Sequence, residues 1–269
     1  MRDSNPRPGD KESPALPTEL TTRGTQAPET LECRWKPISI YGLAAHPRHR
    51  QNARMSHWEI RIALVLTLFL AGIPEGSSAA TPTVSDVIAT MAVKGRAPKT
   101  GYTREQFGTA WKDVDGNSCD TRNDILKRDL IDIVYKDRCT ILSGILPDPF
   151  SGESIDFVRG VGTSNAVQID HVVALSNAWQ SGAFKLTVEK RTAFANDPLN
   201  LLAVKGVLNS QKGDGDAATW LPPKKSYRCA YVARQVAVKA KYGLWLTAPE
   251  KAAIVKIIAT CPKQLVPTK

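Results

Sequence analysis

The sequence predicts an α+β fold: one helix-rich domain around a small β-β-α core, with two disulfides. Residues 166–174 and 199–204 are short and dense in aliphatic and β-branched residues, as is typical of strands. Apolar residues at helical spacing recur on both sides of these segments. Residues 81–269 also contain an even number of cysteines, which favours disulfides in a secreted chain. This segment is long enough to build one hydrophobic core.

The elements predicted before the first strand are mostly helical. Helices are expected over residues 84–93, 103–113 and 123–134. In the second of these, Phe107 and Trp111 lie four residues apart on one face. In the third, the apolar residues at helical spacing are Ile125, Leu126, Leu130 and Ile133. The Gly- and Pro-rich segment 143–152 predicts a loop or hairpin.

The predicted first strand, residues 166–174, places Asp170 and His171 at the edge of a strand or hairpin. Two short helices are expected before the second strand, over residues 177–182 and 188–196. Gly206 breaks the second strand, and a helix carrying Asn209 and Lys212 follows. The last two helices are predicted at residues 227–242 and 249–260. The final one opens with a capping box, Thr247-Ala-Pro-Glu250.

An apolar run at residues 62–73, followed by small residues, predicts a signal peptide. The run is too short to span a bilayer. We therefore expect residues 55–80 to be the signal peptide and the processed chain to be secreted, with no stable membrane anchor. The alternative is an uncleaved anchor. Residues 1–54 lack apolar periodicity, so they are interpreted as a mis-called start or a disordered extension.

The positive charge of the processed chain is unevenly distributed. Residues 81–184 carry 11 basic and 13 acidic side chains, a net charge of −2, whereas residues 185–263 carry 14 and 5, a net charge of +9. A basic half of this kind favours a polyanionic partner, either nucleic acid or an anionic envelope polymer. The charge alone is also compatible with a well-solvated surface. No protein partner is predicted.

The four cysteines of the processed chain are Cys119, Cys139, Cys229 and Cys261. Four cysteines allow three disulfide connectivities. We favour Cys119 with Cys139 and Cys229 with Cys261, because each pair brackets one local segment. A zinc site built from all four is the competing interpretation, but no CxxC pair supports it.

His171 is the only histidine beyond the predicted signal peptide, because His46, His49 and His57 precede or lie within it. This excludes a multi-histidine zinc site. An imidazole with an ordinary pKa of about 6.5 suits a general base. Asp170 points to the opposite face of an extended strand, so it is better placed to bind a metal than to orient its neighbour.

Three motifs carry a resemblance to a known family. They are Ile169-Asp-His-Val-Val-Ala-Leu175, Asn196-Asp-Pro-Leu-Asn-Leu-Leu202 and Asn209-Ser-Gln-Lys-Gly-Asp214. Together they resemble the DH…N…NxxK signature of HNH (ββα-metal) endonucleases. More narrowly, residues 102–261 resemble secreted bacterial HNH endonuclease-family proteins, which are related to the C-terminal nuclease domain of GmrSD-type restriction enzymes.

The resemblance implies a role for each motif residue. His171 would activate water, and Asp170 and Asn209 would hold a divalent metal. Asn200 would brace the loop that holds the histidine, and Lys212 would contact the phosphate. A ligand set of oxygens with one carboxylate favours Mg²⁺ or Mn²⁺.

The sequence therefore predicts that residues 81–269 form a secreted, metal-dependent HNH endonuclease domain. It would hydrolyse phosphodiester bonds of nucleic acid, with DNA favoured over RNA. The alternative is a non-catalytic, secreted polyanion-binding protein on a degenerate HNH scaffold. A serine or cysteine hydrolase is disfavoured, because no nucleophile motif accompanies His171 and the cysteines are expected to be paired.

One loop partly resembles a calcium site. Asp113, Asp115, Asn117 and Asp124 occupy positions 1, 3, 5 and 12 of a calcium-loop pattern. Position 6 is Ser118 instead of glycine, and the terminal glutamate is replaced by aspartate. Both departures favour a turn stitched by Cys119 over a calcium site.

Overall fold

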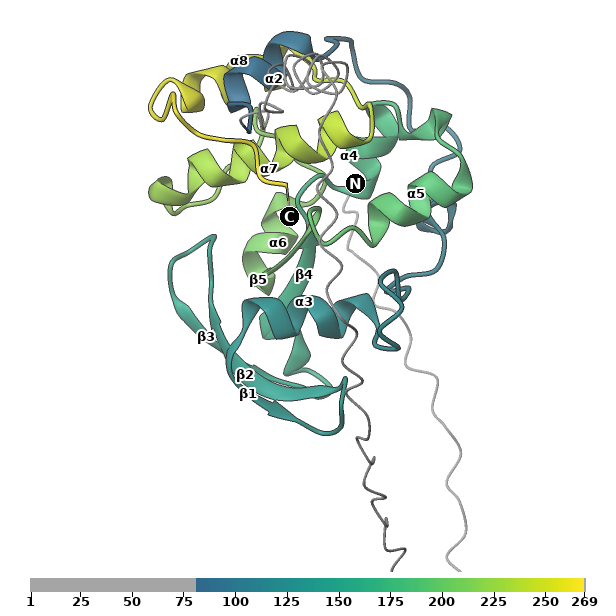
Figure 1. Ribbon diagram of the computed structural model, residues 1–269, viewed down its shortest axis with the longest axis vertical. Helices are drawn as coiled ribbons and strands as arrows, with labels where there is room; N and C mark the ends of the chain where they lie inside the picture. The colour runs from purple at the N-terminus through teal and green to yellow at the C-terminus, as the bar shows by residue number, and fades with distance from the viewer. Residues whose placement is uncertain (1–80, 269) are drawn as a thin grey trace, which may run out of the picture. The chain divides into compact units, whose positions relative to one another are not determined.

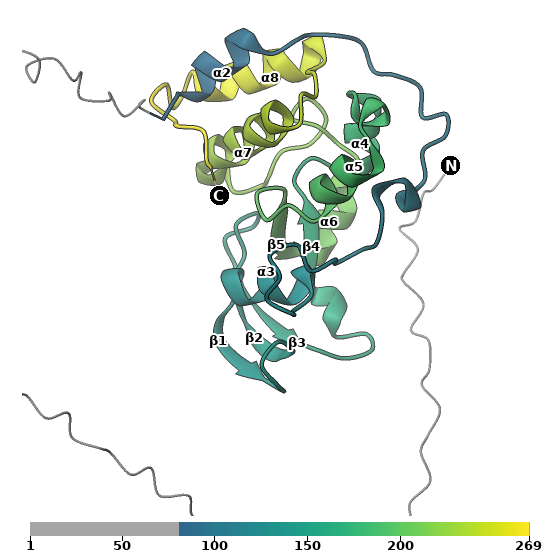
Figure 2. The same ribbon diagram turned by 45° about the vertical axis from the view of Figure 1, so that its right-hand side comes forward.

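The computed structural model describes residues 81–268 (Figures 1 and 2). The predicted signal peptide, 55–80, and the segment 1–54 lie outside these residues. The described part is a mixed α+β domain with seven α-helices. The helices are α2 (Val84–Thr90), α3 (Thr121–Asp129), α4 (Leu175–Gln180), α5 (Val188–Ala195), α6 (Gly206–Lys212), α7 (Arg228–Lys241) and α8 (Ala248–Ile258). None of these helices is long and apolar enough to cross a membrane.

The strands form two antiparallel sheets. The strands are β1 (Ile131–Tyr135), β2 (Ile141–Pro147), β3 (Ser154–Val158), β4 (Val167–His171) and β5 (Leu201–Lys205). The first three form one sheet in the order β1-β2-β3, and the last two form the other. In both views, α2, α7 and α8 lie at one end of the domain, the three-stranded sheet lies at the other, and β4 and β5 lie between them (Figures 1 and 2).

The predicted β-β-α order is confirmed by β4, β5 and α6. β4 pairs with β5 so that His171 is opposite Leu201. α6 begins at Gly206, directly after β5. A Cβ atom at position 206 would collide with the carbonyl oxygen of Asn165, so glycine permits this close turn from strand to helix. The helix thus returns immediately against β4.

The helix predicted over 123–134 was wrong at its C-terminal end. α3 begins earlier, at Thr121, because the side chain of Asp120 caps its N-terminus. It ends at Asp129, and Ile131–Tyr135 is strand β1, paired with β2. The β-branched residues of this segment gain a partner strand that local periodicity does not reveal. The hairpin predicted at 143–152 is confirmed in part, because β2 and β3 flank its turn.

The helix predicted over 103–113 was also wrong. Only Arg104–Phe107 forms a turn of 3-10 helix. Gly108 follows with a φ of 75°, and a Cβ atom there would collide with Thr192. Because the chain turns at this glycine, Trp111 leaves the expected helical face and packs instead beside the core under α3.

The two faces of the β4–β5 sheet contact different cores. Val167 and Ile169 pack with α3 and the three-stranded sheet. Leu202 packs with α2, α7 and α8. The side chain of His171 contacts Ala195 and Trp111, whereas that of Asp170 contacts Lys212 of α6. The opposite orientation expected for these two neighbours is confirmed.

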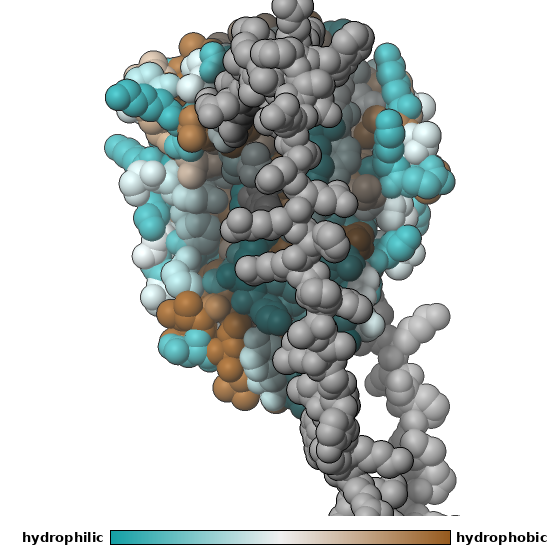
Figure 3. All heavy atoms as spheres, viewed as in Figure 1, coloured by the Kyte–Doolittle hydropathy of each residue, from teal (hydrophilic) through white to brown (hydrophobic). Residues whose placement is uncertain are grey.

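The outer side of the three-stranded sheet is exposed. Apolar side chains gather there, at the lower end of the domain as viewed in Figure 3. The exposed large apolar residues of its three strands are Ile131, Val134, Tyr135, Leu142 and Val158. The core of this end of the domain therefore lies on the inner side of the sheet, under α3.

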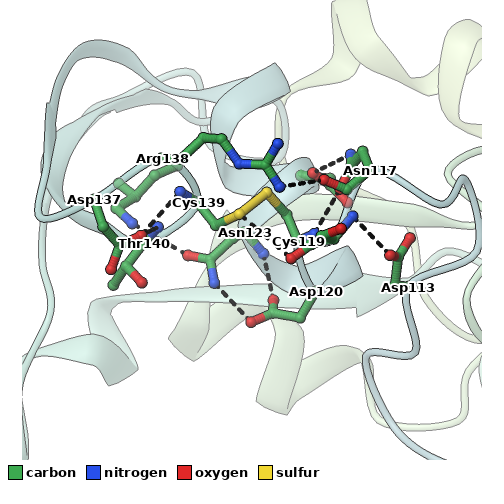
Figure 4. The surroundings of a disulfide bond; sticks show 12 residues. Asp113, Asn117, Cys119, Asp120, Asn123, Asp137, Arg138, Cys139 and Thr140 are labelled. Atoms are coloured by element: carbon green, nitrogen blue, oxygen red, sulfur yellow. Dashed lines mark hydrogen bonds between the residues drawn. A yellow bond between two sulfur atoms is a disulfide. The ribbon is translucent and has the colours of Figure 1, made fainter.

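The two disulfides have the predicted pairing. Cys119 and Cys139 join the loop before α3 to the β1–β2 turn (Figure 4). Cys229 and Cys261 join the start of α7 to the chain just after α8. This pairing rules out a zinc site built from the four thiolates. The predicted capping box at the start of α8 is also present.

Candidate functional site

His171 lies at the end of β4 with one ring nitrogen already engaged. Its Nε2 lies 2.9 Å from the carbonyl oxygen of Ala195, at the end of α5. A carbonyl oxygen only accepts, so this contact assigns the proton to Nε2 and leaves the lone pair on Nδ1. Burial lowers the pKa of His171 to about 3. The ring is therefore neutral near pH 7 and can accept a proton at Nδ1.

Asn200 is fully buried. It connects the chain just after His171 to the end of α5. Its Oδ1 accepts a hydrogen bond from the backbone N–H of Val173 at 2.9 Å. Its Nδ2 donates to the carbonyl oxygens of Val173 and Phe194, at 3.4 and 3.3 Å. Asn200 thus ties the chain after His171 to the end of α5 that accepts from the imidazole. A role in catalysis stays a prediction.

Asp170 and Lys212 form a buried ion pair on the other face of β4. The Nζ atom of Lys212 lies 2.8 Å from Asp170 Oδ1 and donates to the carbonyl oxygen of His171, also at 2.8 Å. Both side chains are almost completely buried. Burial raises the pKa of Asp170, although the ammonium of Lys212 opposes this shift. Lys212 therefore contacts a buried carboxylate, and its contact with a phosphate stays a prediction.

Asn209 lies on the same side as Asp170. Its Nδ2 donates to Gln168 Oε1 at 2.9 Å. Gln168 and Asp170 are two residues apart on β4 and therefore share a face. Asp170, Asn209 and Lys212 thus line one side of the β-β-α unit, and His171 and its contacts occupy the other.

Two oxygen atoms on this side suit a hard divalent cation. Asp170 Oδ2 is buried and has no hydrogen-bond partner within residues 81–268. Asn209 donates through its amide nitrogen, which leaves its Oδ1 as a further oxygen donor. In the described residues no group of three or more His, Cys, Asp or Glu side chains could hold a metal. A role of these two oxygens in binding a divalent metal stays a prediction.

The side chains that surround His171 were not predicted from the sequence. Trp111 stacks on the imidazole, with ring centroids 6.3 Å apart and an interplanar angle of 19°. The guanidinium carbon of Arg122 lies 5.9 Å from the centroid of the indole. The charge of Arg104 also acts on the imidazole and lowers the pKa of His171 further. These arginines belong to the half of the chain with a net negative charge, so neither charge distribution nor spacing could identify them.

The loop that partly resembles a calcium site is held by its own hydrogen bonds (Figure 4). Asp113 accepts from the backbone N–H groups of Gly116 and Ser118, both at 2.8 Å. The side chain of Asn117 donates to Asp115 and Asp124, both at 3.0 Å. The acidic side chains therefore accept from donors within the loop, as in the stitched turn favoured by the sequence.

The fold and the site define a mixed α+β domain with two disulfides and a histidine held at the end of a β-β-α unit. A family model described as "GmrSD restriction endonucleases, C-terminal domain" matches residues 120–257, just over half of the chain. The chain belongs to this family. The predicted relation to these restriction enzymes is confirmed, and membership indicates a nuclease-like function with a nucleic-acid substrate.

The chain is also similar to a protein of Arthroderma benhamiae described as an uncharacterized secreted protein. The two are 36% identical over 181 residues, which cover 66% of this chain and 85% of the relative. No solved structure matches the chain.

Proposed function

We propose that this protein is a secreted, metal-dependent endonuclease of the HNH type, with His171 as the general base. The observation that carries the proposal is the imidazole itself: Nε2 is fixed on the carbonyl of Ala195, and Nδ1 keeps its lone pair. The restriction-enzyme family supports a nuclease that acts on nucleic acid. The secreted relative and the two disulfides support an extracellular location.

In this mechanism, His171 Nδ1 removes a proton from water as its oxygen attacks the phosphorus atom. The new oxygen–phosphorus bond forms while the bond to the 3′ oxygen breaks, and solvent protonates the departing oxygen. By family analogy, the products are a 5′-phosphate and a 3′-hydroxyl. Asp170 and Asn209 lie on the other face of β4 from the imidazole, so a divalent cation that they hold would supply charge neutralisation to a phosphate bound across the end of the strand.

The low pKa of His171 in the free protein is compatible with a general base that acts beside a bound phosphate. In the free protein, burial lowers the pKa of the imidazole to about 3, so the ring is neutral near pH 7. A bound phosphate adds negative charge, which raises the pKa of a nearby imidazole toward the working pH. Asn200 positions the base by tying Val173 to the end of α5, and the ammonium of Lys212 opposes the rise that burial causes in the pKa of Asp170.

Plasmid cleavage tests the proposal. The secreted protein, purified with oxidised disulfides, is incubated with Mg²⁺, Mn²⁺, Zn²⁺ or EDTA, beside His171→Ala and the exposed control Lys190→Gln. We expect metal-dependent nicking that falls by about 100-fold or more in His171→Ala, since general bases contribute roughly 10²–10⁴. DNA affinity and circular dichroism should not change. Wild-type rates in His171→Ala would overturn the assignment of the base.

A second candidate is a non-catalytic, secreted polyanion-binding protein on the same scaffold. The buried ion pair favours it, because the ammonium of Lys212 neutralises Asp170 without a metal. Salt-sensitive DNA binding without cleavage under any metal would support this candidate against the nuclease.

A further inference from the structure

Trp111 stacks on the imidazole of His171 and has an unusual backbone conformation. Its φ is 57°, in the left-handed region that a bulky side chain rarely adopts, and such residues cluster at functional sites. Thr121 holds this conformation. Its backbone N–H donates to the carbonyl oxygen of Trp111 at 3.2 Å, and its hydroxyl donates to that of Lys112.

The end of α5 holds the histidine and the tryptophan segment together. Ala195 accepts the hydrogen bond from the imidazole. The next residue, Asn196, accepts from the backbone N–H of Lys112 at 3.0 Å and donates to the carbonyl oxygen of Thr109 at 3.3 Å. Two consecutive residues therefore set the distance between the proposed base and the indole.

Arg122 follows Thr121 and places a guanidinium group over the indole of Trp111. Within residues 81–268, this group makes no hydrogen bond or ion pair with another side chain or backbone atom. The side chain is half-buried. Burial lowers the pKa of Arg122, and the nearby charge of Arg159 lowers it further. A partly desolvated cation beside a second cation favours the binding of an anion.

The acidic group that acts on Arg122 is engaged elsewhere. Asp120 attracts the guanidinium electrostatically. However, its two carboxylate oxygens accept hydrogen bonds from the backbone and side chain of Asn123, at 2.8 and 2.7 Å. Asp120 thus caps α3 and leaves the planar fork of Arg122 available to a ligand.

These contacts lead to an inference that rests on the proposed nuclease function. We propose that Arg122, held against Trp111, binds a backbone phosphate of the nucleic-acid strand next to the bond that His171 attacks. A guanidinium group matches two phosphate oxygens, and an aromatic face favours and orients it. Arg122 would thus do what the sequence assigned to Lys212, from the opposite side of β4.

The salt dependence of DNA binding tests this inference. Binding of a duplex of about 20 base pairs is measured between about 50 and 200 mM NaCl, in a His171→Ala background so that the DNA stays intact. Loss of one phosphate contact lowers the slope of log K against log salt concentration by about 0.9. We expect this change in Arg122→Gln, with an affinity loss of roughly ten-fold. Arg122→Lys should keep the slope and lose part of the affinity.

Lys127→Gln is the matched control. Lys127 is exposed on the same helix, about 140° around the axis from Arg122, and the substitution removes the same charge. Its slope should equal that of the parent. Melting temperatures should agree within about 3 °C, because Arg122 makes no hydrogen bond among the described residues.

The outcomes separate this inference from the nuclease proposal. If Arg122→Gln and Lys127→Gln have equal slopes and affinities, Arg122 does not bind phosphate, whether or not the wild-type protein cleaves DNA. If the slope falls only in Arg122→Gln while the wild-type protein cleaves nothing, the phosphate site stands and the nuclease proposal fails.

Discussion

At the scale of single residues, burial determines what the ionisable groups of the site can do. Lys212 is one helical turn beyond Asn209, so the sequence predicted a phosphate contact for it. In the structure its whole side chain is buried, and its ammonium pairs with Asp170. A buried charge requires a partner, and Asp170 provides one. His171 is half-buried, and desolvation of its ring lowers its pKa to about 3, so it stays neutral near pH 7.

Lys212→Met should therefore lower the free energy of unfolding by about 3–5 kcal/mol, because it leaves the carboxylate of Asp170 buried without a counter-charge. Addition of Asp170→Asn should restore part of the loss. Urea unfolding of both variants measures this, with Lys190→Met on the exposed surface of α5 as the control. A loss below about 1 kcal/mol in Lys212→Met would contradict the pairing.

At the scale of elements, the site depends on three segments that approach β4 from different sides. α6 places Asn209 and Lys212 on the face of Asp170. The end of α5 accepts from His171. The start of α3 places Arg122 over Trp111, and the disulfide from Cys119 anchors the loop before it (Figure 4). The two disulfides should therefore differ in function although both stabilise the fold.

Removal of either disulfide by paired Cys→Ser substitutions should lower the free energy of unfolding by about 3–4 kcal/mol, as loop-closure entropy predicts for these spacings. Only loss of Cys119–Cys139 should also weaken DNA binding, by roughly ten-fold, since it releases the segment before Arg122. Binding and thermal melts of the two double variants, measured at a temperature where both are folded, make the comparison. If the two double variants bind DNA with equal affinity, the loop held by Cys119–Cys139 does not contribute to DNA binding.

At the scale of the whole molecule, binding and chemistry are expected to depend on different charges. The basic excess lies in residues 185–263, and it attracts a polyanion irrespective of metal. The candidate metal ligands, by contrast, comprise one carboxylate and one amide. Long-range attraction to nucleic acid should therefore persist without a cation.

Chelation with EDTA should abolish plasmid cleavage and leave DNA affinity within about three-fold at a fixed ionic strength, because phosphate contacts dominate binding. Re-addition of Mg²⁺ or Mn²⁺ should restore cleavage. Filter binding and nicking assays on the same samples provide the measurement. A loss of affinity beyond about ten-fold in EDTA would mean that the metal bridges protein and DNA. It would contradict the prediction that DNA binding does not depend on the metal.

The sequence by itself determined the features that depend on neighbouring residues. The strands and helix of the β-β-α unit follow from local composition and periodicity, and the disulfide pairs follow from cysteine spacing. The separation of Asp170 from His171 follows from strand alternation. These features are local, so a single sequence was sufficient to predict them.

Only the tertiary structure decided the rest. Ile131–Tyr135 is a strand because β2 pairs with it. Trp111 reaches His171 because a glycine ends the preceding turn and the end of α5 holds both segments. Arg122 lies over Trp111, whose ring stacks on the proposed base, whereas Lys212 is buried against Asp170. Each outcome depends on strand pairing, burial or charge between segments that are far apart in the chain, and no local pattern in the sequence encodes these contacts.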